Sequence, residues 1–389
     1  MKFKFLIIFV LLFSILFSQE NITNAKKERS IFRPVIFGLV YPLSTNHSKH
    51  DSTYLNLALI QNTVGKVKGV NLCGFSAVSS KSVKGIQGSL LYSQINENLK
   101  GVSFSTINVV NHNIKGVQFG TAANLLGGSF VGFQSSGIVN FLGGNFVGYQ
   151  QSTVFNIVGK SFVGLQTAGA GNVVGGNFKG VQFGSSFNFV GKVMKGLQWS
   201  GVNVCAELTG LQVGWINISQ INHKWQIGVM NLAEEQKGIP VGLINISDDG
   251  DIQWQNYVSN FAGFVTAVRF ISNNFVSSVE MGAPNLKSDY DSSALLGFHY
   301  GYRWLIHKFG LETDLGFFHI ENFDEDGNND YPDNFALQLR FSATFRINKW
   351  LEIYGGFGGS TMSEYVLEED AESIDNEDSY LYFAGINLF

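Results

Sequence analysis

Residues 145–158 read NFVGYQQSTVFNIV, and glycines flank this stretch at Gly143, Gly144 and Gly159. The same pattern, a glycine followed by a hydrophobic residue and then usually a glutamine, recurs through residues 68–250, mostly at a step of 16 residues. An asparagine follows eight residues behind the glycine at Asn124, Asn140, Asn156, Asn172 and Asn188, and the later asparagines Asn203, Asn217, Asn231 and Asn245 lie 14 apart. A fixed short period predicts a repeat structure, because one unit is too small to bury its own core and must pack on its neighbours.

The composition of each unit favours strands over helices. Val, Phe, Ile, Ser and Gly are abundant, whereas the strong helix formers Ala and Glu are scarce. Because alternate side chains of a strand share a face, one face of residues 145–158 is mostly small or polar and the other is mostly apolar. The first face carries Gly148, Gln150, Ser152, Val154 and Asn156, and the second carries Val147, Tyr149, Gln151, Thr153, Phe155 and Ile157.

Two all-β architectures accommodate these repeats. In the first, each repeat is one strand in the wall of an antiparallel outer-membrane-type β-barrel of about twenty strands. That wall requires loops with an odd number of residues, such as Gly143–Asn145. A shift of one residue would point the Gly/Gln/Asn face of every second strand to the wrong side of the wall. In the second, each repeat is one coil of a parallel β-solenoid, with Gln over Gln and Asn over Asn, followed by a small C-terminal β-barrel of about eight strands. We expect the first architecture, because the strands after residue 251 have the pattern of a barrel wall, and we keep the solenoid as the alternative.

The chain begins with a segment typical of a signal peptide. Lys2 and Lys4 precede an apolar run over residues 5–17. This run is shorter than the roughly 20 residues that a membrane-spanning helix needs, and it suits the core of a signal peptide. We therefore expect residues 1–18 to direct export of the chain.

Behind this segment we expect three regions. Residues 19–67 form a polar leader and a first strand hairpin, which is built from Val35–Leu43 and Tyr54–Val64. Residues 68–250 form the glycine, glutamine and asparagine repeat region. Residues 251–389 form the C-terminal barrel strands with acidic loops.

The strands of the third region have two distinct faces. In residues 335–347 the residues Phe, Leu, Leu, Phe, Ala, Phe and Ile alternate with polar ones, and residues 295–307 alternate in the same way. Strands of about 10 to 12 residues with an unbroken apolar face are typical of barrel strands that contact lipid. Short turns at 272–274 and 348–349 alternate with long polar stretches at 285–293, 321–334 and 360–379, which is the outer-membrane pattern.

The composition indicates a location in the cell envelope. Charged residues make up only 14% of the chain, and aromatic residues also make up 14%, with 35 phenylalanines. Such a composition suits contact with lipid, whereas the net charge of −4 gives no basic patch for nucleic acid. We therefore expect a protein of the cell outer membrane, exposed at the cell surface. Its expected partner is membrane lipid, with a surface ligand that the sequence leaves undefined and no nucleic acid.

Five charged residues fall on the polar side of neighbouring C-terminal strands, namely Arg303, Glu312, Asp314, Arg340 and Arg346. Because unpaired charges are costly in a low-dielectric wall, we expect ion pairs that neutralise one another inside the barrel. The alternative is a selectivity feature that lines a pore. An enzyme would need an acid and a base together, and Glu312, Asp314 and His299 are the loose candidates. We expect no enzyme, with no catalytic and no cofactor-binding residues.

One acidic loop carries the type of ligand that calcium prefers. Asp324, Asp326, Asn328 and Asp330 alternate around Gly327 and supply side-chain oxygens. The glycine comes too early for a full calcium-binding loop, and no glutamate completes its end. A solvated loop is therefore the favoured interpretation, and Ca²⁺ bridging at the outer surface is the alternative.

The chain has two cysteines, Cys73 and Cys205, which both lie within repeats. They are separated by about eight repeats, and stacked repeats would hold them far beyond the reach of a disulfide. We expect two buried free thiols.

The pattern Gly-x-Gln-x-x-x-x-x-Asn-x-x-Gly-Gly at residues 132–144 and 164–176 resembles the repeats of an uncharacterised family of bacterial surface-repeat proteins. The shorter forms Gly210–Asn217 and Gly238–Asn245 look like the same family. The resemblance covers about half of the chain and implies a cell-envelope location. It brings no activity and no site residue with it.

Overall fold

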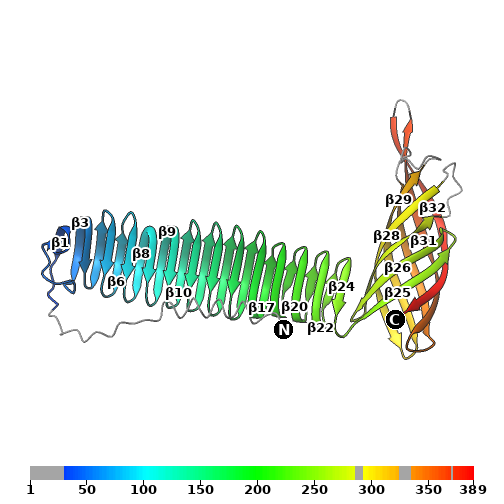
Figure 1. Cartoon of the computed structure of the whole chain (residues 1–389), viewed down its shortest axis with the longest axis horizontal. Helices are drawn as coiled ribbons and strands as arrows, with labels where there is room; N and C mark the ends of the chain where they lie inside the picture. The colour runs from blue at the N-terminus through cyan, green and yellow to red at the C-terminus, as the bar shows by residue number, and fades with distance from the viewer. Residues whose placement is uncertain (1–29, 285–291, 324–333, 369–370) are drawn as a thin grey trace.

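The structure is a computed structural model that describes residues 30–284, 292–323, 334–368 and 371–389. The side chains at 284, 292, 323 and 364–377 are also outside this description. All regular structure within the described ranges is β, and the strands divide into two units. Strands β1–β24 wind into a long solenoid, and strands β25–β32 close into a barrel (Figure 1).

The solenoid is one continuous sheet of 24 strands. Its first strands are β1 (Val35–Val40), β2 (Leu43–Ser44), β3 (Thr53–Val64), β4 (Val67–Cys73), β5 (Ser76–Ser79), β6 (Val83–Gly88), β7 (Tyr92–Ile95), β8 (Leu99–Val110), β9 (Ile114–Leu126), β10 (Phe130–Ser136), β11 (Val139–Leu142) and β12 (Phe146–Ser152). The later strands are β13 (Phe155–Val158), β14 (Phe162–Ala168), β15 (Gly171–Val174), β16 (Phe178–Gly184), β17 (Phe187–Trp199), β18 (Val202–Leu208), β19 (Leu211–Val213), β20 (Ile216–Asn222), β21 (Trp225–Ile227), β22 (Met230–Gln236), β23 (Ile239–Val241) and β24 (Ile244–Ser247).

Each repeat forms one coil of this solenoid, which has about 13 coils. In residues 146–158, β12 and β13 are the two strands of one coil, and β12 pairs in parallel with β10 and β14. Gln150 lies opposite Gln134 and Gln166 in these neighbours. The expected antiparallel barrel wall of repeat strands is therefore wrong, and the alternative of a solenoid with a small C-terminal barrel is correct.

The glycine pairs turn corners instead of closing hairpins. The amide of Gly144 donates to the carbonyl of Gly128, 2.9 Å away in the preceding coil, and the amide of Gly128 donates to His112 in the same way, at 3.1 Å. When a corner stacks on an identical corner, its backbone N–H and C=O groups form hydrogen bonds with the neighbouring coil. In a hairpin loop of a barrel wall, water would have to form these hydrogen bonds. The period of the sequence thus reports the length of one coil and not the length of one strand.

Buried amide side chains form two ladders inside the coils. Gln150 donates to Gln134 at 2.7 Å, and Gln166 donates to Gln150 at 2.8 Å. In the second ladder, Asn140 donates one N–H to Asn156 at 2.8 Å and the other to the carbonyl of Gln151 at 2.6 Å. An amide carries both donors and an acceptor, so identical residues in register satisfy one another, and burial costs little.

An apolar column completes the interior on the side of the glycine corners. Phe130, Phe146, Phe162 and Phe178 are buried, and successive rings stack with centroids 4.8–5.1 Å apart. Leu142 and the equivalent residues of the following coils are buried in the same cluster. The interior is therefore packed, with an apolar half near the glycine corners and an amide half near the opposite turns.

The repeated glycine before each glutamine has a steric cause. Gly148 has φ of +133°, a conformation that residues with a side chain rarely adopt. A Cβ atom at Gly148 would lie 1.9 Å from the carbonyl oxygen of Gly132 in the preceding coil. Only glycine allows the coils to approach this closely.

The hairpin expected in residues 35–64 is wrong. β1 pairs with β3 in parallel, and β3 pairs in parallel with β4, so both are part of the coil stack. Only the two-residue strand β2 runs antiparallel to β1. The two predicted strands exist, but the period-2 pattern that predicts a strand carries no information on the direction of its partner.

The second unit is a closed barrel of eight antiparallel strands. They are β25 (Asp251–Ser259), β26 (Ala262–Ser272), β27 (Phe275–Pro284), β28 (Ser292–Ile306), β29 (Phe309–Phe323), β30 (Asn334–Arg346), β31 (Leu351–Glu368) and β32 (Ala371–Leu388). The expected long loop at 360–379 is instead largely a hairpin of β31 and β32, which projects beyond the other strands (Figure 1).

The barrel wall caps the last coil of the solenoid. The final asparagine of the ladder, Asn245, donates to Ser277 Oγ on β27 at 3.0 Å, and Ser247 Oγ lies 2.7 Å from Ser272 Oγ. Tyr300 on β28 donates its hydroxyl to the carbonyl of Pro240 at 2.9 Å. The long axis of the solenoid runs across the barrel axis, so the solenoid strands stand alongside the barrel (Figure 1).

Candidate functional site

The barrel interior holds a dense network of ion pairs. Arg303 on β28 pairs with Glu352 on β31 and lies 3.2 Å from Glu312 on β29. Glu312 also accepts a hydrogen bond from Arg269 on β26 at 2.6 Å. Asn387 on β32 donates to Glu352 at 2.9 Å. Because all of these side chains are buried, each charge depends on its partners.

A second cluster of the interior centres on Arg340. Its guanidinium donates to Asp314 at 2.7 Å and to Glu280 at 3.3 Å. His299 Nδ1 lies 2.7 Å from Asp314, and Tyr257 donates to Glu280 at 2.7 Å. The two clusters together take side chains from all eight strands of the barrel, and they tie the wall together across its lumen.

Four of the five charged residues predicted for the polar side lie in these clusters, namely Arg303, Glu312, Asp314 and Arg340. Arg346 lies at the end of β30, half exposed, 3.6 Å from Asp251 and 3.9 Å from Glu352. The sequence analysis missed Arg269, Glu280 and Glu352. Each of the three stands between apolar neighbours in a strand, and this alternation could have placed it on the lumen side of the barrel wall.

The described lumen is closed. The cavity among Arg269, His299, Glu312 and Arg340 measures about 10 Å³, which is room for about one water molecule. The loose candidates for an acid and a base are His299, Asp314 and Glu312. His299 and Asp314 do meet, but both are held by the Arg340 cluster, and Glu312 is held by two arginines. This arrangement stabilises the barrel and leaves no space for a substrate.

The predicted calcium loop lies outside the described residues, since Asp324, Asp326, Asn328 and Asp330 all fall in the range 324–333. Within the described part of the chain, no group of three or more His, Cys, Asp or Glu side chains is placed to hold a metal ion. Cys73 and Cys205 are free and buried, as predicted. Burial raises the pKa of Cys73 to about 11 and the pKa of Cys205 further still, so neither thiol is reactive at neutral pH.

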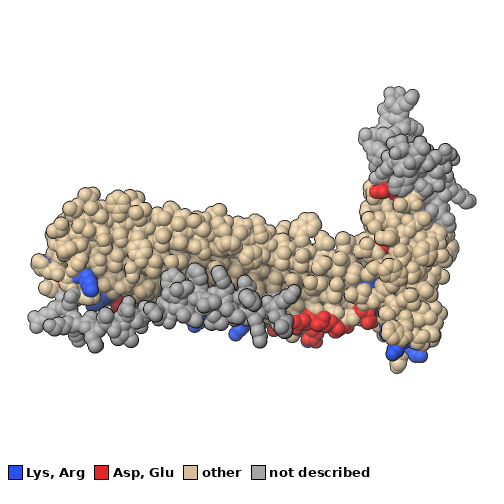
Figure 2. Space-filling model, in the orientation of Figure 1, with Lys and Arg blue, Asp and Glu red and all other residues tan. Residues whose placement is uncertain are grey.

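The charges of the solenoid all gather at one side of every coil. All charged residues between 64 and 250 lie at the glycine corners or at the positions stacked on them. We call this line of positions the charged corner. It consists of residues 64–68, 80–84, 96–100, 111–115, 127–131, 143–147, 159–163, 175–179, 191–195, 207–210, 221–224, 234–238 and 248–250. On the face shown in Figure 2, the coloured atoms of the solenoid follow one edge only.

The opposite turns carry no charge at all. We call this surface the charge-free edge; it consists of residues 74–75, 88–91, 104–106, 119–122, 135–138, 151–154, 167–170, 183–186, 199–201, 213–215, 227–229 and 241–243. Large apolar side chains stand exposed there, with Trp215 72%, Leu90 67% and Ile138 53% exposed. Such residues are unusual at the tips of turns that face water.

The two outer faces of the solenoid are apolar as well. The outward residues of β10 and β12 include Val131 and Val147, which are 46% and 44% exposed. On the other face, Phe155 of β13 is also exposed. The polar-inside and apolar-outside arrangement predicted for the repeats is thus present, although it belongs to a solenoid.

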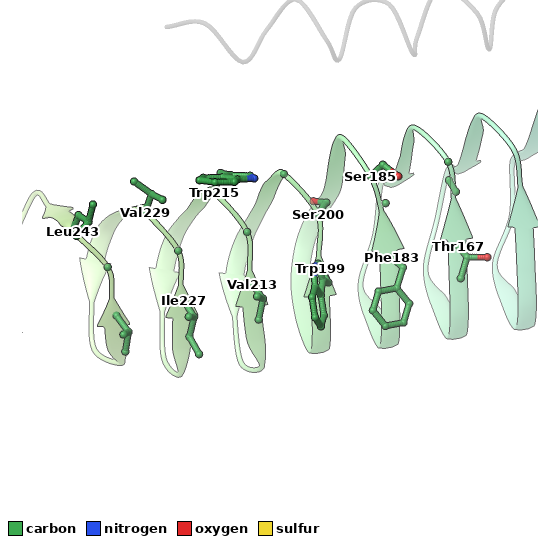
Figure 3. A pocket seen from close by; sticks show the side chains of 18 of the residues that line it. Thr167, Phe183, Ser185, Trp199, Ser200, Val213, Trp215, Ile227, Val229 and Leu243 are labelled. Carbon is green, nitrogen blue, oxygen red and sulfur yellow. The ribbon is translucent and has the colours of Figure 1, made fainter. Parts of the chain in front are cut away.

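A groove follows the charge-free edge. Near the barrel, one rim carries Phe183, Trp199, Val213 and Ile227, and the other carries Trp215, Val229 and Leu243 (Figure 3). Small residues such as Gly214 and Gly228 lie between the rims, because a Cβ atom there would meet the preceding coil within 2.2 Å. The triplets of a glycine between two apolar residues in 213–215, 227–229 and 241–243 are the sequence signal of this groove, and the sequence analysis missed it.

The groove extends along most of the solenoid. Its three segments have volumes of about 1140, 580 and 780 Å³ from the barrel outwards. Ser152 and Thr167 line both the first and the second segment, and Phe119 and Thr121 line both the second and the third. At the barrel the groove ends on Phe298 and Tyr300, two outward side chains of β28. No charged side chain lines any of the three segments.

No family model, no curated protein and no solved structure matches this chain. Among the described residues, no helix has the length and apolar character to cross a membrane. The geometry of the two units therefore carries the functional conclusion.

Proposed function

We propose that this chain is a non-enzymatic protein of the outer membrane and cell surface, in which the barrel anchors the solenoid to the membrane. Residues 1–18 direct export, and β25–β32 cross the bilayer. The solenoid is then a binding module held at the membrane. The uncharged apolar surface of the solenoid makes its ligand apolar.

One observation carries this proposal, namely the outer surface of the barrel. Outward residues such as Leu337, Leu339 and Phe341 of β30 are each 44–51% exposed, and they alternate with buried polar residues of the lumen. A row of this kind recurs on neighbouring strands, for example at Leu311, Leu315 and Phe317 of β29. In water such a belt costs free energy, whereas in lipid it is the expected surface of a barrel.

The closed lumen favours an anchor over a pore. An eight-stranded barrel has an interior that its own side chains fill, and here ion pairs fill it. A passive pore would need a continuous water path, and the cavity among the lumen side chains has room for only about one water molecule. The adhesive or scaffolding role of the solenoid follows as the better account.

The experiment combines gel migration with solute efflux. Purified protein in detergent is run with and without boiling and is then reconstituted into vesicles loaded with a small dye. A faster band without boiling, together with dye retention, supports a closed membrane barrel. Extraction of the protein from membranes without detergent would contradict the anchor, and steady dye efflux would contradict the closed lumen.

Two substitutions, one within β30 and one just after its end, sharpen the test. Phe341→Arg places a charge at the middle of the wall and should destabilise a lipid-embedded barrel by about 2–4 kcal/mol, whereas Ile347→Arg at the strand end should cost about 0–1 kcal/mol. The readout is the denaturant midpoint of the gel shift in lipid vesicles. Equal and small effects of both substitutions would mean that the wall faces water.

A further inference from the structure

We infer that the solenoid itself lies in the plane of the membrane, and that its ligand is phosphate-bearing lipid. Its charge-free edge and outer faces contact acyl chains, and its charged corner lies at the headgroups. The inference rests on the proposed anchorage of the barrel, and it adds a lipid-binding surface of about 13 coils.

The charged corner is complementary to phosphate groups. Residues 64–206 contain ten lysines and a single acidic residue, Glu97. The other acidic residues of the repeat region, such as Glu207, Glu234 and Glu235, lie in the coils nearest the barrel. Lysines in line along the border of an apolar surface are the usual feature of proteins that lie in a membrane interface, because the amine reaches the headgroups while the apolar part stays in the chains.

The apolar surface is too large for a protein surrounded by water. Contiguous exposed apolar patches on soluble monomers rarely exceed a few hundred Å². Here the outer faces of the solenoid and the charge-free edge form a mostly apolar surface from the first coil to the barrel, with residues as large as Phe75, Trp199 and Trp215 exposed. Uncharged polar side chains such as Ser135 and Gln151 interrupt this surface at the edge of the middle coils.

The apolar surface of the solenoid is continuous with the wall of the barrel. The groove ends on Phe298 and Tyr300, which belong to the same outward face as the exposed Leu296 and Trp304. Lipid that covers this wall therefore also reaches the groove. In Figure 2 the charged corner lies toward the end of the barrel that carries blue atoms, and red atoms lie toward the opposite end of the barrel.

The dimensions agree with immersion. The solenoid strands stand alongside the barrel, and the seven residues of β12 span roughly 23 Å at about 3.3 Å per residue. The apolar band of a membrane barrel is about 25 Å tall. With its charged corner at the headgroups, the charge-free edge therefore reaches the hydrocarbon region. The groove there gives acyl chains an uncharged channel, which is apolar in its two end segments and lined by Ser, Thr and Gln side chains in its middle segment.

The test measures the depth of four labelled positions in the full chain. Single cysteines replace Ser185 at the charge-free edge, Lys160 at the charged corner, Leu339 on the barrel wall and Lys349 at the barrel end. Each carries an environment-sensitive fluorophore and is reconstituted into phosphatidylglycerol-containing vesicles whose acyl chains are brominated. The parent chain is labelled in parallel as a control, since its two cysteines are buried.

We expect brominated chains to quench the probes at Ser185 and Leu339 at least threefold more than the probes at Lys160 and Lys349. Quenching at Leu339 without quenching at Ser185 would overturn the inference and leave the anchored barrel intact. Absence of quenching at Leu339 would overturn the proposed function itself. A Ser185→Cys disulfide dimer that excludes lipid would show that a second copy covers this edge, and it would also overturn the inference.

Discussion

The solenoid and the barrel both bury polar side chains inside and expose apolar ones outside, yet the buried polar groups of the two units differ in their chemistry. The solenoid holds neutral amide ladders such as Gln134–Gln150–Gln166, with no charged residue among them. The barrel holds charged networks around Arg303 and Arg340. Both interiors are buried to a similar degree, so burial alone does not select the residues.

The difference follows from what each architecture places side by side. In a parallel in-register stack, every residue lies about 4.8 Å from a copy of itself, so a buried charge would face like charges. An amide is complementary to its own copy, and a carboxylate is not. In the antiparallel barrel, different residues face one another across the lumen, so an arginine can meet a glutamate. Symmetry of the repeat thus dictates neutral ladders, and loss of symmetry permits ion pairs.

The largest effect is expected from breaking the barrel network on one side. Arg303→Met leaves the buried Glu352 without its main partner and leaves Glu312 with Arg269 alone, and it should lower the stability of the barrel by about 3–5 kcal/mol. Arg346→Met, at a half-exposed site, should cost less than about 1 kcal/mol. The denaturant midpoint of the gel shift measures both. Equal losses would mean that the network contributes no more than a surface pair.

The next effect comes from placing a charge in an amide ladder. Asn156 donates to Asn172 at 2.9 Å and to the carbonyl of Thr167 at 2.7 Å, and aspartate can donate neither bond. Asn156→Asp should cost about 3 kcal/mol and raise amide exchange in the adjacent coils. In the exposed Asn145, the side-chain oxygen accepts from the amide of Ser161, and aspartate retains that bond. Asn145→Asp should therefore change stability by less than about 0.5 kcal/mol. Exchange that is unchanged in both variants would rule out the ladder as a source of stability.

Close stacking gives a third comparison between the two units. Gly164→Ala introduces a Cβ atom at φ of +131°, 1.9 Å from the carbonyl oxygen of Gly148. The expected cost is about 2–3 kcal/mol, confined to the coils around residue 164. Gly359→Ala on the barrel wall meets no atom within 4 Å and should be neutral within about 1 kcal/mol. Hydrogen exchange followed coil by coil distinguishes the two outcomes. An unperturbed Gly164→Ala variant would refute the stacking geometry.

The smallest effect concerns the first coil and its pH dependence. Burial opposes the ionisation of Asp51, but hydrogen bonds from the Ile31 amide, the His47 amide and the Arg33 side chain hold its pKa below the usual range. Because the pKa is lower in the folded state, the stabilisation is present above the unfolded pKa of about 3.9 and is lost as the pH falls through the folded value.

The measurement is amide exchange in β3 and β4 at several pH values. At pH 7, Asp51→Asn should reduce protection there by about 1–2 kcal/mol, and this difference should shrink below about pH 4. A difference that stays constant down to the lowest pH would show that the carboxylate charge contributes nothing.

The sequence predicted the strands and their two faces, because these depend on local alternation. It did not predict the direction of strand pairing in the repeats. An odd-loop meander and a parallel coil place Gln150 and Asn156 on the same face, so alternation fits both. The clear barrel strands after residue 251 favoured one continuous barrel, although they belong to a separate unit. The self-complementary amides were the decisive signal, since an antiparallel wall gives no reason for identical residues at a fixed period.

The candidate sites were predicted less completely. Alternation placed Arg303 and Arg340 on the polar side, but it did not show which residues meet across the lumen, so Glu280 and Glu352 were missed. The charge-free edge arises only when coils stack and bring turns 16 residues apart into one line. Its local sequences, such as Val213-Gly214-Trp215, look like ordinary strand ends until that stacking is known.

Neutron reflectometry on a single supported bilayer tests the central claim most directly. Deuterated full-length protein is inserted, and its density profile is measured along the membrane normal. If both units face lipid, the ordered protein density stays within the roughly 40–45 Å of the bilayer and its headgroups, because the solenoid lies in the plane. A layer of ordered protein beyond the headgroups, as deep as the roughly 23 Å span of one coil strand, would contradict it, since the solenoid would then stand in water.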